Sequence, residues 1–183
     1  MQGTSQRSAP LPSGELSPLL SLLLESFDFG SAPILGALSF SLVRGESVAL
    51  RGESGIGKTT LMRLVAGLES ARNGTILVNG RIGMVFQEPQ LLRWRTALQN
   101  ITLTTGASPS RALQLLAEVG LEGKEALFPE QLSLGQQRRL AIARAFAVEP
   151  DLLLLDEPFV SLDAELAGQM MTLLEKLQSV YRP

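Results

Sequence analysis

The sequence predicts an α/β domain in which helices cover a mixed sheet. Segments with apolar, strand-like patterns alternate with segments of helical periodicity along most of the 183 residues. A glycine-rich turn at 52–59 stands between a predicted strand and a predicted helix. The leucine run at 152–155 is typical of a strand that is covered on both faces of a sheet. The length is sufficient for one domain with a real core.

The composition is ordinary for a globular domain, with 45% hydrophobic residues, 19% charged residues and a net charge of −2. Because no basic block or aromatic–basic pattern occurs, we expect no nucleic-acid partner. The chain has neither Cys nor His, which excludes disulfides, thiolate chemistry and imidazole ligands or bases. No apolar run approaches the ~20 residues of a membrane helix. The stretch 16–27 contains Pro18 and lacks a small-residue cleavage site, so it indicates a strand and not a signal peptide.

The first part of the chain predicts strands and one helix. Residues 1–15 are rich in Ser, Gln, Pro and Gly and predict a disordered lead before a domain at 16–183. Residues 58–68 predict a helix that ends near Gly67. Strands are expected at 19–27, 34–43 and 46–51.

The middle of the chain predicts a hairpin followed by a helical insert. The segments 74–80 and 81–87 read as strands, and the turn Asn79-Gly80 between them is typical of a hairpin. The insert spans about 96–148. Further helices are expected at 110–120, 134–148 and 163–180, with a strand at 151–155.

The segment GESGIGKT at 52–59 fits the Gly-x4-Gly-Lys-Thr pattern of a phosphate-binding loop. Its glycines let successive backbone N–H groups face a phosphate at a helix N-terminus. Lys58 would reach the β- and γ-phosphate oxygens, Thr59 would offer its hydroxyl to Mg²⁺, and Thr60 could bond the α-phosphate. A glycine-rich turn without a ligand is the alternative. The predicted nucleotide-binding residues are Gly52, Glu53, Ser54, Gly55, Ile56, Gly57, Lys58, Thr59 and Thr60.

The segment LLLLDEP at 152–158 supplies two carboxylates at the end of a strand. In open α/β sheets, ligands bind at the carboxyl ends of strands. Asp156 would therefore hold Mg²⁺, and Glu157 would point the other way and polarise an attacking water. Two acids that only solubilise a strand end are the alternative. Together with the phosphate-binding loop, Asp156 and Glu157 predict a site for a nucleoside triphosphate and Mg²⁺.

The segment LSLGQ at 132–136 predicts an unusual helix start. Ser133 could cap the helix, with Gln136 reaching back from three residues on. Gly135 lies in the first turn, which contains no acid, and Arg138 follows closely. Positive charge is unfavourable near a helix N-terminus unless an anion lies there. The pattern therefore predicts an anion at this helix start, and a helix start exposed to solvent is the alternative.

In this order, the motifs resemble the ATP-binding subunit of ABC transporters over about residues 19–183. GESGIGKTT resembles the Walker A loop and LLLLDEP the Walker B motif, while LSLGQ resembles the LSGGQ signature and SLD the D-loop. The resemblance implies a P-loop ATPase core with a mixed sheet, N-terminal antiparallel strands and a helical insert. It also implies that Gln87 is the Q-loop glutamine, a ligand of Mg²⁺ that acts in catalysis with Lys58 and Glu157. Phe29 would stack on adenine.

The resemblance further implies partners and a location. Two subunits would face head to tail, so that Ser133, Gly135 and Gln136 contact the γ-phosphate of ATP bound to the facing subunit. Membrane-spanning permease subunits and, indirectly, a solute-binding protein would complete an importer at the cytoplasmic face of the inner membrane. The sequence is most similar to importers of the nitrate, sulfonate and taurine group. Leu91, Leu92 and Trp94 could form a docking patch for the permease or ordinary core.

Two departures from the family pattern bear on activity. Leu134 stands where the signature usually has Gly, and no His is present to serve as the switch-loop residue that contacts the γ-phosphate. We therefore expect the C-terminal part of the domain to be missing, through truncation rather than in a naturally short form. A module that binds ATP and hydrolyses it poorly is the alternative to a transport ATPase.

Overall fold

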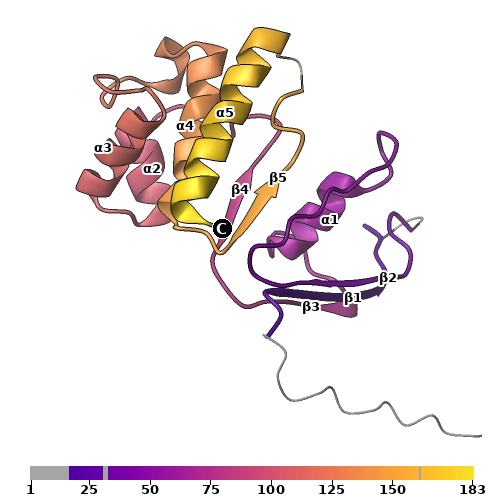
Figure 1. Cartoon of the computed structure of the whole chain (residues 1–183). Coiled ribbons are helices and arrows are strands. Elements are labelled where there is room, and N and C mark those ends of the chain that lie inside the picture. The colour runs from indigo at the N-terminus through magenta and orange to yellow at the C-terminus, as the bar shows by residue number, and fades with distance from the viewer. Residues whose placement is uncertain (1–16, 31–32, 161) are drawn as a thin grey trace, which may run out of the picture.

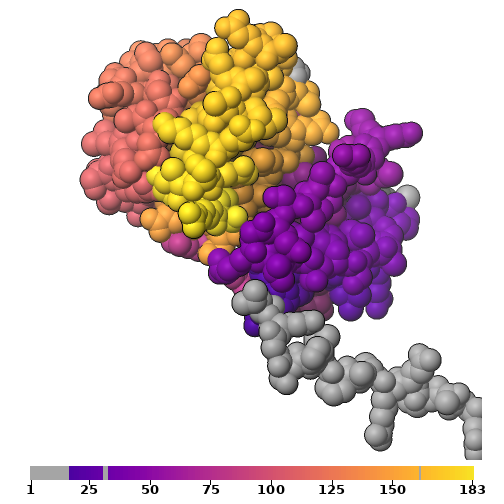
Figure 2. Space-filling view, in the orientation of Figure 1, coloured from indigo at the N-terminus to yellow at the C-terminus, as the bar shows by residue number. Residues whose placement is uncertain are grey.

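The computed structural model describes residues 17–30, 33–160 and 162–183, which form two lobes joined side by side (Figures 1 and 2). The N-terminal lobe contains an antiparallel sheet and helix α1, and the second lobe contains helices α2 to α5 packed against strands β4 and β5. The predicted disordered lead at 1–15 and the first residue of the SLD motif lie outside the described residues.

The first sheet is built from β1 (Leu20–Ser26), β2 (Leu38–Leu42) and β3 (Asn73–Val78) in the order β2-β1-β3. Both pairings are antiparallel, as expected for the N-terminal strands. The even-numbered leucines of β1 point into the lobe, whereas Leu23 between them is 59% exposed. Helix α1 (Lys58–Val65) covers the inner face with its apolar side, so the phosphate-loop helix rests directly on this sheet.

The predicted hairpin at Asn79-Gly80 is wrong. Strand β4 (Ile82–Val85) pairs in parallel with β5 (Leu152–Leu155), whereas β3 pairs with β1. Asn79 donates its backbone N–H to the carbonyl of Leu19, at 2.8 Å, and a Cβ on Gly80 would lie 2.6 Å from the Cβ of Asp151. These contacts carry the chain from one sheet to the other, so long-range pairing overrides the local turn signal.

The predicted strand at 46–51 does not form among the described residues. The segment has no strand pairing, and Val48 is 57% exposed, although Leu50 packs against the core of the first lobe. The described part of the second sheet is the pair β4 and β5, and Leu153 to Leu155 are only partly buried. Apolar periodicity shows that a segment suits a strand, but it does not supply a neighbouring strand with which to pair.

The predicted helices are confirmed. Each of the longer ones begins at a side-chain cap: Thr96 for α2, Ser108 for α3, Ser133 for α4 and Asp163 for α5. A short 3₁₀ helix, η1, precedes α4. The bounds are Ala97–Thr105 for α2, Pro109–Glu118 for α3, Pro129–Gln131 for η1, Leu134–Ala147 for α4 and Ala164–Tyr181 for α5.

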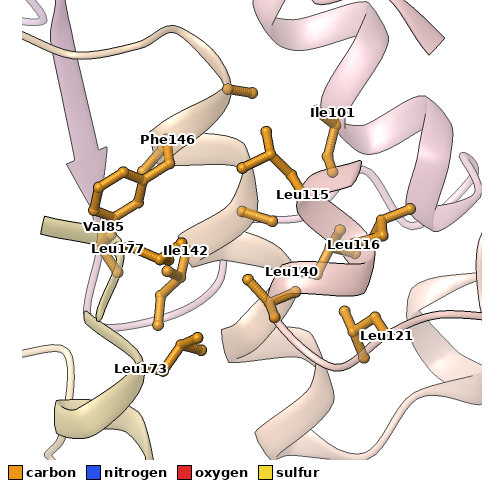
Figure 3. Packing of buried hydrophobic residues seen from close by; sticks show 14 of the residues in the cluster. Val85, Ile101, Leu115, Leu116, Leu121, Leu140, Ile142, Phe146, Leu173 and Leu177 are labelled. Carbon is orange, nitrogen blue, oxygen red and sulfur yellow. The ribbon is translucent and has the colours of Figure 1, made fainter. Parts of the chain in front are cut away.

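Helix α4 is the centre of the second lobe. Figure 3 shows Leu140, Ile142 and Phe146 of α4 among leucines of α3 and α5. Each such side chain, when fully buried, contributes roughly 1.5–3 kcal/mol. The helix whose start carries LSLGQ is thus anchored by the core from Leu140 onward. In the described part of the chain, no helix is both long and apolar enough to cross a membrane.

Candidate nucleotide-binding site

The phosphate-binding loop runs into α1 through glycines with left-handed backbone angles. Gly57, the N-cap of α1, has a φ of 104°, and Gly55 has a φ of 84°. A Cβ on Gly57 would lie 2.6 Å from Cδ2 of Leu35, whereas a Cβ on Gly55 would meet nothing within 4 Å. The loop is therefore pressed against the turn that follows β1 on one side and is open on the other.

Lys58 lies across this loop. Its Nζ donates hydrogen bonds to the carbonyls of Gly52 and Glu53, both at 3.0 Å, and lies 3.7 Å from Oε1 of Glu157. The side chain is only 18% exposed, so the ammonium group is fixed at the mouth of the loop. In that place, phosphate oxygens can take over from the carbonyls as its partners.

Thr59 and Asp156 bring the helix start and the strand end together. The Thr59 hydroxyl donates to Oδ1 of Asp156 at 3.0 Å. Asp156 is 4% exposed, and its backbone N–H donates to the carbonyl of Val85, which aligns the ends of β4 and β5. A hydroxyl and a carboxylate at this distance are the hard oxygen donors that Mg²⁺ prefers, so the residues present fit that ion.

At Glu157 the backbone turns away from the direction of strand β5. Its φ is 46°, a left-handed angle uncommon outside glycine, so a sharp turn and not strand alternation sets its position. The turn brings its carboxylate to Lys58, and its side chain remains 44% exposed. A partly exposed carboxylate beside the phosphate loop can accept a proton from water.

Phe29 and Gln87 border this region from two other segments. Phe29 is 56% exposed and meets Phe27 edge to face, with ring centroids 5.0 Å apart. The same turn returns through Leu35, which contacts the phosphate loop. Gln87 is exposed after β4 and lines a cavity of about 690 Å³ between the loop at 87–93 and α4. Adenine stacking by Phe29 and metal binding by Gln87 stay predictions.

The start of α4 forms the predicted capping box. The backbone N–H of Gln136 donates to Oγ of Ser133 at 3.2 Å, and the N–H of Ser133 donates to Oε1 of Gln136 at 3.0 Å. Gly135 packs near Leu166 of α5, and Leu134 is 52% exposed. Within the described residues, no hydrogen bond or ion pair joins this segment to 52–60, so the structure does not bring it to the phosphate loop of the same chain.

The residue that sequence reasoning missed is Arg138. It is 9% exposed and donates from Nη2 to the carbonyl of Val160 at 3.0 Å. From the sequence it is one of two adjacent arginines near a helix start, and helical periodicity places it on the same face as Ala141 and Ala145, both buried. The spacing of Arg138 with these two alanines is the sequence feature that could have indicated its burial.

Comparison with known proteins decides the family. Residues 35–160 match the family model described as ABC transporter. The chain belongs to the ABC transporter ATP-binding family. It is therefore an ATPase domain of the ABC type, with a mixed α/β architecture. Nothing in the comparisons supports the alternative of a module that hydrolyses ATP poorly.

The relatives found are importer subunits. The chain is 43% identical over 168 residues to an aliphatic sulfonates import ATP-binding protein SsuB of Granulibacter bethesdensis, covering 91% of this chain and 71% of the relative. It is 44% identical to an SsuB 2 of Rhodococcus jostii, with 85% of this chain and 65% of the relative covered. The chain thus spans about two thirds of the length of these proteins.

A solved structure agrees with this assignment. The dimeric structure of the ATP-binding cassette MJ0796, in a post-hydrolysis state bound to ADP and Pi, superposes with a TM-score of 0.76 at 30% sequence identity. The match covers 89% of this chain and 84% of that one.

Proposed function

We propose that this chain is the ATP-binding and ATP-hydrolysing subunit that powers an ABC importer for aliphatic sulfonates or related solutes of the nitrate and taurine group. The observation that carries the ATP site is the 3.0 Å hydrogen bond between Thr59 and Asp156, with Lys58 beside it. It joins the phosphate loop to the Walker B carboxylate. The names of the SsuB relatives support the solute class.

The proposal gives each residue of the site a role that its place in the structure supports. Backbone N–H groups of 55–59 and the ammonium group of Lys58 bind the β- and γ-phosphates, and Thr59 and Asp156 hold Mg²⁺. Bound Mg²⁺ supplies neutralisation of charge on the phosphate oxygens. Glu157 orients the attacking water and accepts its proton, while Gln87 approaches from the end of β4.

A second copy of the chain would complete the site. The signature residues 133–136 lie apart from the chain's own phosphate loop, and their exposed, acid-free helix start suits the γ-phosphate of a facing copy. The dimeric state of the structural relative supports this arrangement.

The permease would dock beside the loop that follows β4. Of the three residues predicted for docking, Leu91 is partly buried and packs against the core of the second lobe, Leu92 is partly buried, and Trp94 is 69% exposed. Tryptophan is enriched among the residues that contribute most to protein–protein interfaces. In this proposal the subunit works at the cytoplasmic face of the membrane, with a solute-binding protein on the other side; the names of the import relatives support it.

Replacement of Lys58 tests the ATP site. Lys58→Ala removes the positive charge over the loop, so the affinity for ATP should fall by at least about 10-fold, as for the loss of a charge-assisted contact. Fluorescence titration with a labelled ATP measures it. Lys176→Ala, on the exposed face of α5, is the matched control and should bind ATP like the parent. Equal affinity in the Lys58 variant would contradict the assignment.

Uptake of a labelled alkanesulfonate tests the transport role. In cells that lack their own SsuB-type subunit, the chain and the Lys176→Ala variant should restore uptake, and the Lys58→Ala variant should not. Restoration by the parental chain of the uptake of an unrelated solute, in cells that lack the ATP-binding subunit of another importer, but not of alkanesulfonate uptake, would contradict the solute class while leaving the ATP site in place.

A further inference from the structure

Among the described residues, Arg138 is the buried arginine whose hydrogen bonding is incomplete; Arg111, which is only partly buried and stacks on the ring of Tyr181, also has two buried nitrogens without a partner. In the described part of the chain, three polar or charged side chains are buried: Asn100, Arg138 and Asp156. Asn100 is satisfied by surrounding backbone groups, and Asp156 accepts from Thr59. For Arg138, only Nη2 has a partner, and Nε and Nη1 are buried without one. Such an arrangement is costly and needs an explanation beyond packing.

The single partner of Arg138 joins two parts of the ATPase machinery. Arg138 lies on α4, five residues after the Ser133 cap. Its acceptor is the carbonyl of Val160, whose own N–H donates to the carbonyl of Glu157 at 3.2 Å. One guanidinium group therefore links the helix that begins at the signature to the turn that carries the hydrolytic carboxylate.

The same side chain adjoins the loop that follows β4. Arg138 lines the cavity of about 690 Å³ together with Gln87 and Glu88. The described ion pairs do not include Arg138, so no carboxylate fixes it in place.

We propose that Arg138 is a positioning residue that holds the turn at 157–160 against α4 and so fixes Glu157 relative to Ser133. The inference rests on the proposed function, because Glu157 would serve ATP on its own phosphate loop and Ser133 the ATP of a facing copy. Arg138 touches neither nucleotide. It acts through the carbonyl of Val160 and ties the two ATP sites together within one subunit.

Kinetics of two variants test the proposal. Arg138→Met keeps the length of the side chain and removes its charge and N–H groups, so kcat should fall on the order of 10²-fold, the cost of a misplaced catalytic group. The KM for ATP should stay within about twofold, because the phosphate loop is untouched. Arg138→Lys retains a charged donor toward Val160 and should recover part of kcat.

The neighbouring arginine gives the matched control. Arg139 lies on the same helix and donates to the carbonyl of Val119 and to Gln169, away from the Glu157 turn. Arg139→Met should leave kcat and KM within about twofold of the parent. Parental kcat in Arg138→Met, or equal losses of kcat and ATP affinity with no recovery in Arg138→Lys, would overturn the proposal.

Hydrogen exchange of backbone amides tests the proposal without depending on ATP hydrolysis, and we call it the exchange arm. In Arg138→Met without nucleotide, the amides of Glu157, Phe159 and Val160 and those of 133–136 should exchange together about 10-fold faster, while those of α3 stay as in the parent. If that variant does not fold, Arg138→Lys is measured and should show a smaller acceleration in the same two segments. Unchanged exchange there, or acceleration throughout the lobe, would overturn the proposal. A parental chain that hydrolyses no ATP would count against the proposed function, and the exchange arm would still decide the role of Arg138.

Discussion

Lys58 faces two kinds of acceptor, neutral loop carbonyls at 3.0 Å and the carboxylate of Glu157 at 3.7 Å. The carboxylate is 44% exposed, so water weakens this ion pair. Phosphate oxygens form shorter, charge-assisted contacts and would displace both partners. Binding of ATP would therefore also release Glu157 from the lysine, which makes the carboxylate available to a water molecule.

Glu157→Gln separates these two roles. The amide keeps the shape of the side chain and cannot accept the proton of the attacking water, so the rate of phosphate release should fall by roughly 10²–10⁴-fold. The affinity for ATP should be equal to or higher than that of the parent, because Lys58 loses a competing partner. Binding and phosphate release are measured side by side.

Glu165→Gln, in the exposed first turn of α5, is the control for the loss of one negative charge. It should match the parent in both measurements. Phosphate release at the parental rate by Glu157→Gln would show that another group activates the water.

At the scale of elements, the features that sequence reasoning predicted correctly depend on local chemistry. The helices at 110–120, 134–148 and 163–180 were predictable because caps and apolar periodicity lie within each segment. Thr59 and Asp156 were each expected to hold Mg²⁺, and the structure joins them by a hydrogen bond; their roles toward the metal stay predictions. The β3–β4 hairpin was predicted wrongly because sheet pairing joins segments far apart in sequence. Helical spacing places Arg138 on the buried face of α4, but its hydrogen bond to Val160 depends on packing against a turn 22 residues away, which no local pattern specifies.

The two glycines of the phosphate loop give a prediction about this element. Gly57→Ala and Gly55→Ala both place a side chain at a left-handed angle, at a similar cost of roughly 1 kcal/mol. Only the Gly57 variant also forces a Cβ to within 2.6 Å of Leu35. Gly57→Ala should therefore lower the free energy of unfolding by about 1–3 kcal/mol more than Gly55→Ala, as for overpacking. Urea unfolding measures the difference, and equal values would contradict the loop geometry.

The start of α4 gives a second prediction at this scale. Ser133→Asp and Ser133→Asn both keep an N-cap acceptor, so both variants should fold with α4 intact. Only the Asp variant brings a negative charge to the γ-phosphate of a facing copy. ATP-dependent dimerisation, measured by sedimentation, should be lost in Ser133→Asp and largely kept in Ser133→Asn, while each monomer still binds ATP. Dimerisation of both variants to the parental extent would contradict the arrangement in trans.

At the scale of the whole molecule, the lobes share a core and an ionic link. Leu152 of β5 lies in the same apolar cluster as the inner faces of β1 and α1. Beside it, Asp151 accepts from the backbone N–H of Arg81 at 2.7 Å and from the side chain of Arg44, which lies in the turn after β2. The N–H of Arg81, and then the Arg44 guanidinium, hold the pKa of the Asp151 carboxyl below its ordinary value of 3.8.

This lowered pKa makes the joint between the lobes dependent on pH. A carboxyl whose pKa is lower in the folded state than in the unfolded state stabilises the fold above its ordinary pKa, and that contribution is lost as the pH falls through its folded value. Asp151→Asn retains an acceptor for Arg81 and cannot ionise. The parent should be more stable than Asp151→Asn in urea at about pH 7, and the difference should shrink as the pH falls toward about 3. Glu149→Gln removes only an exposed pairing with the same Arg81, at 3.2 Å, and should follow the pH dependence of the parent. A constant difference between the parent and Asp151→Asn over this range would show that ionisation of Asp151 does not hold the lobes together.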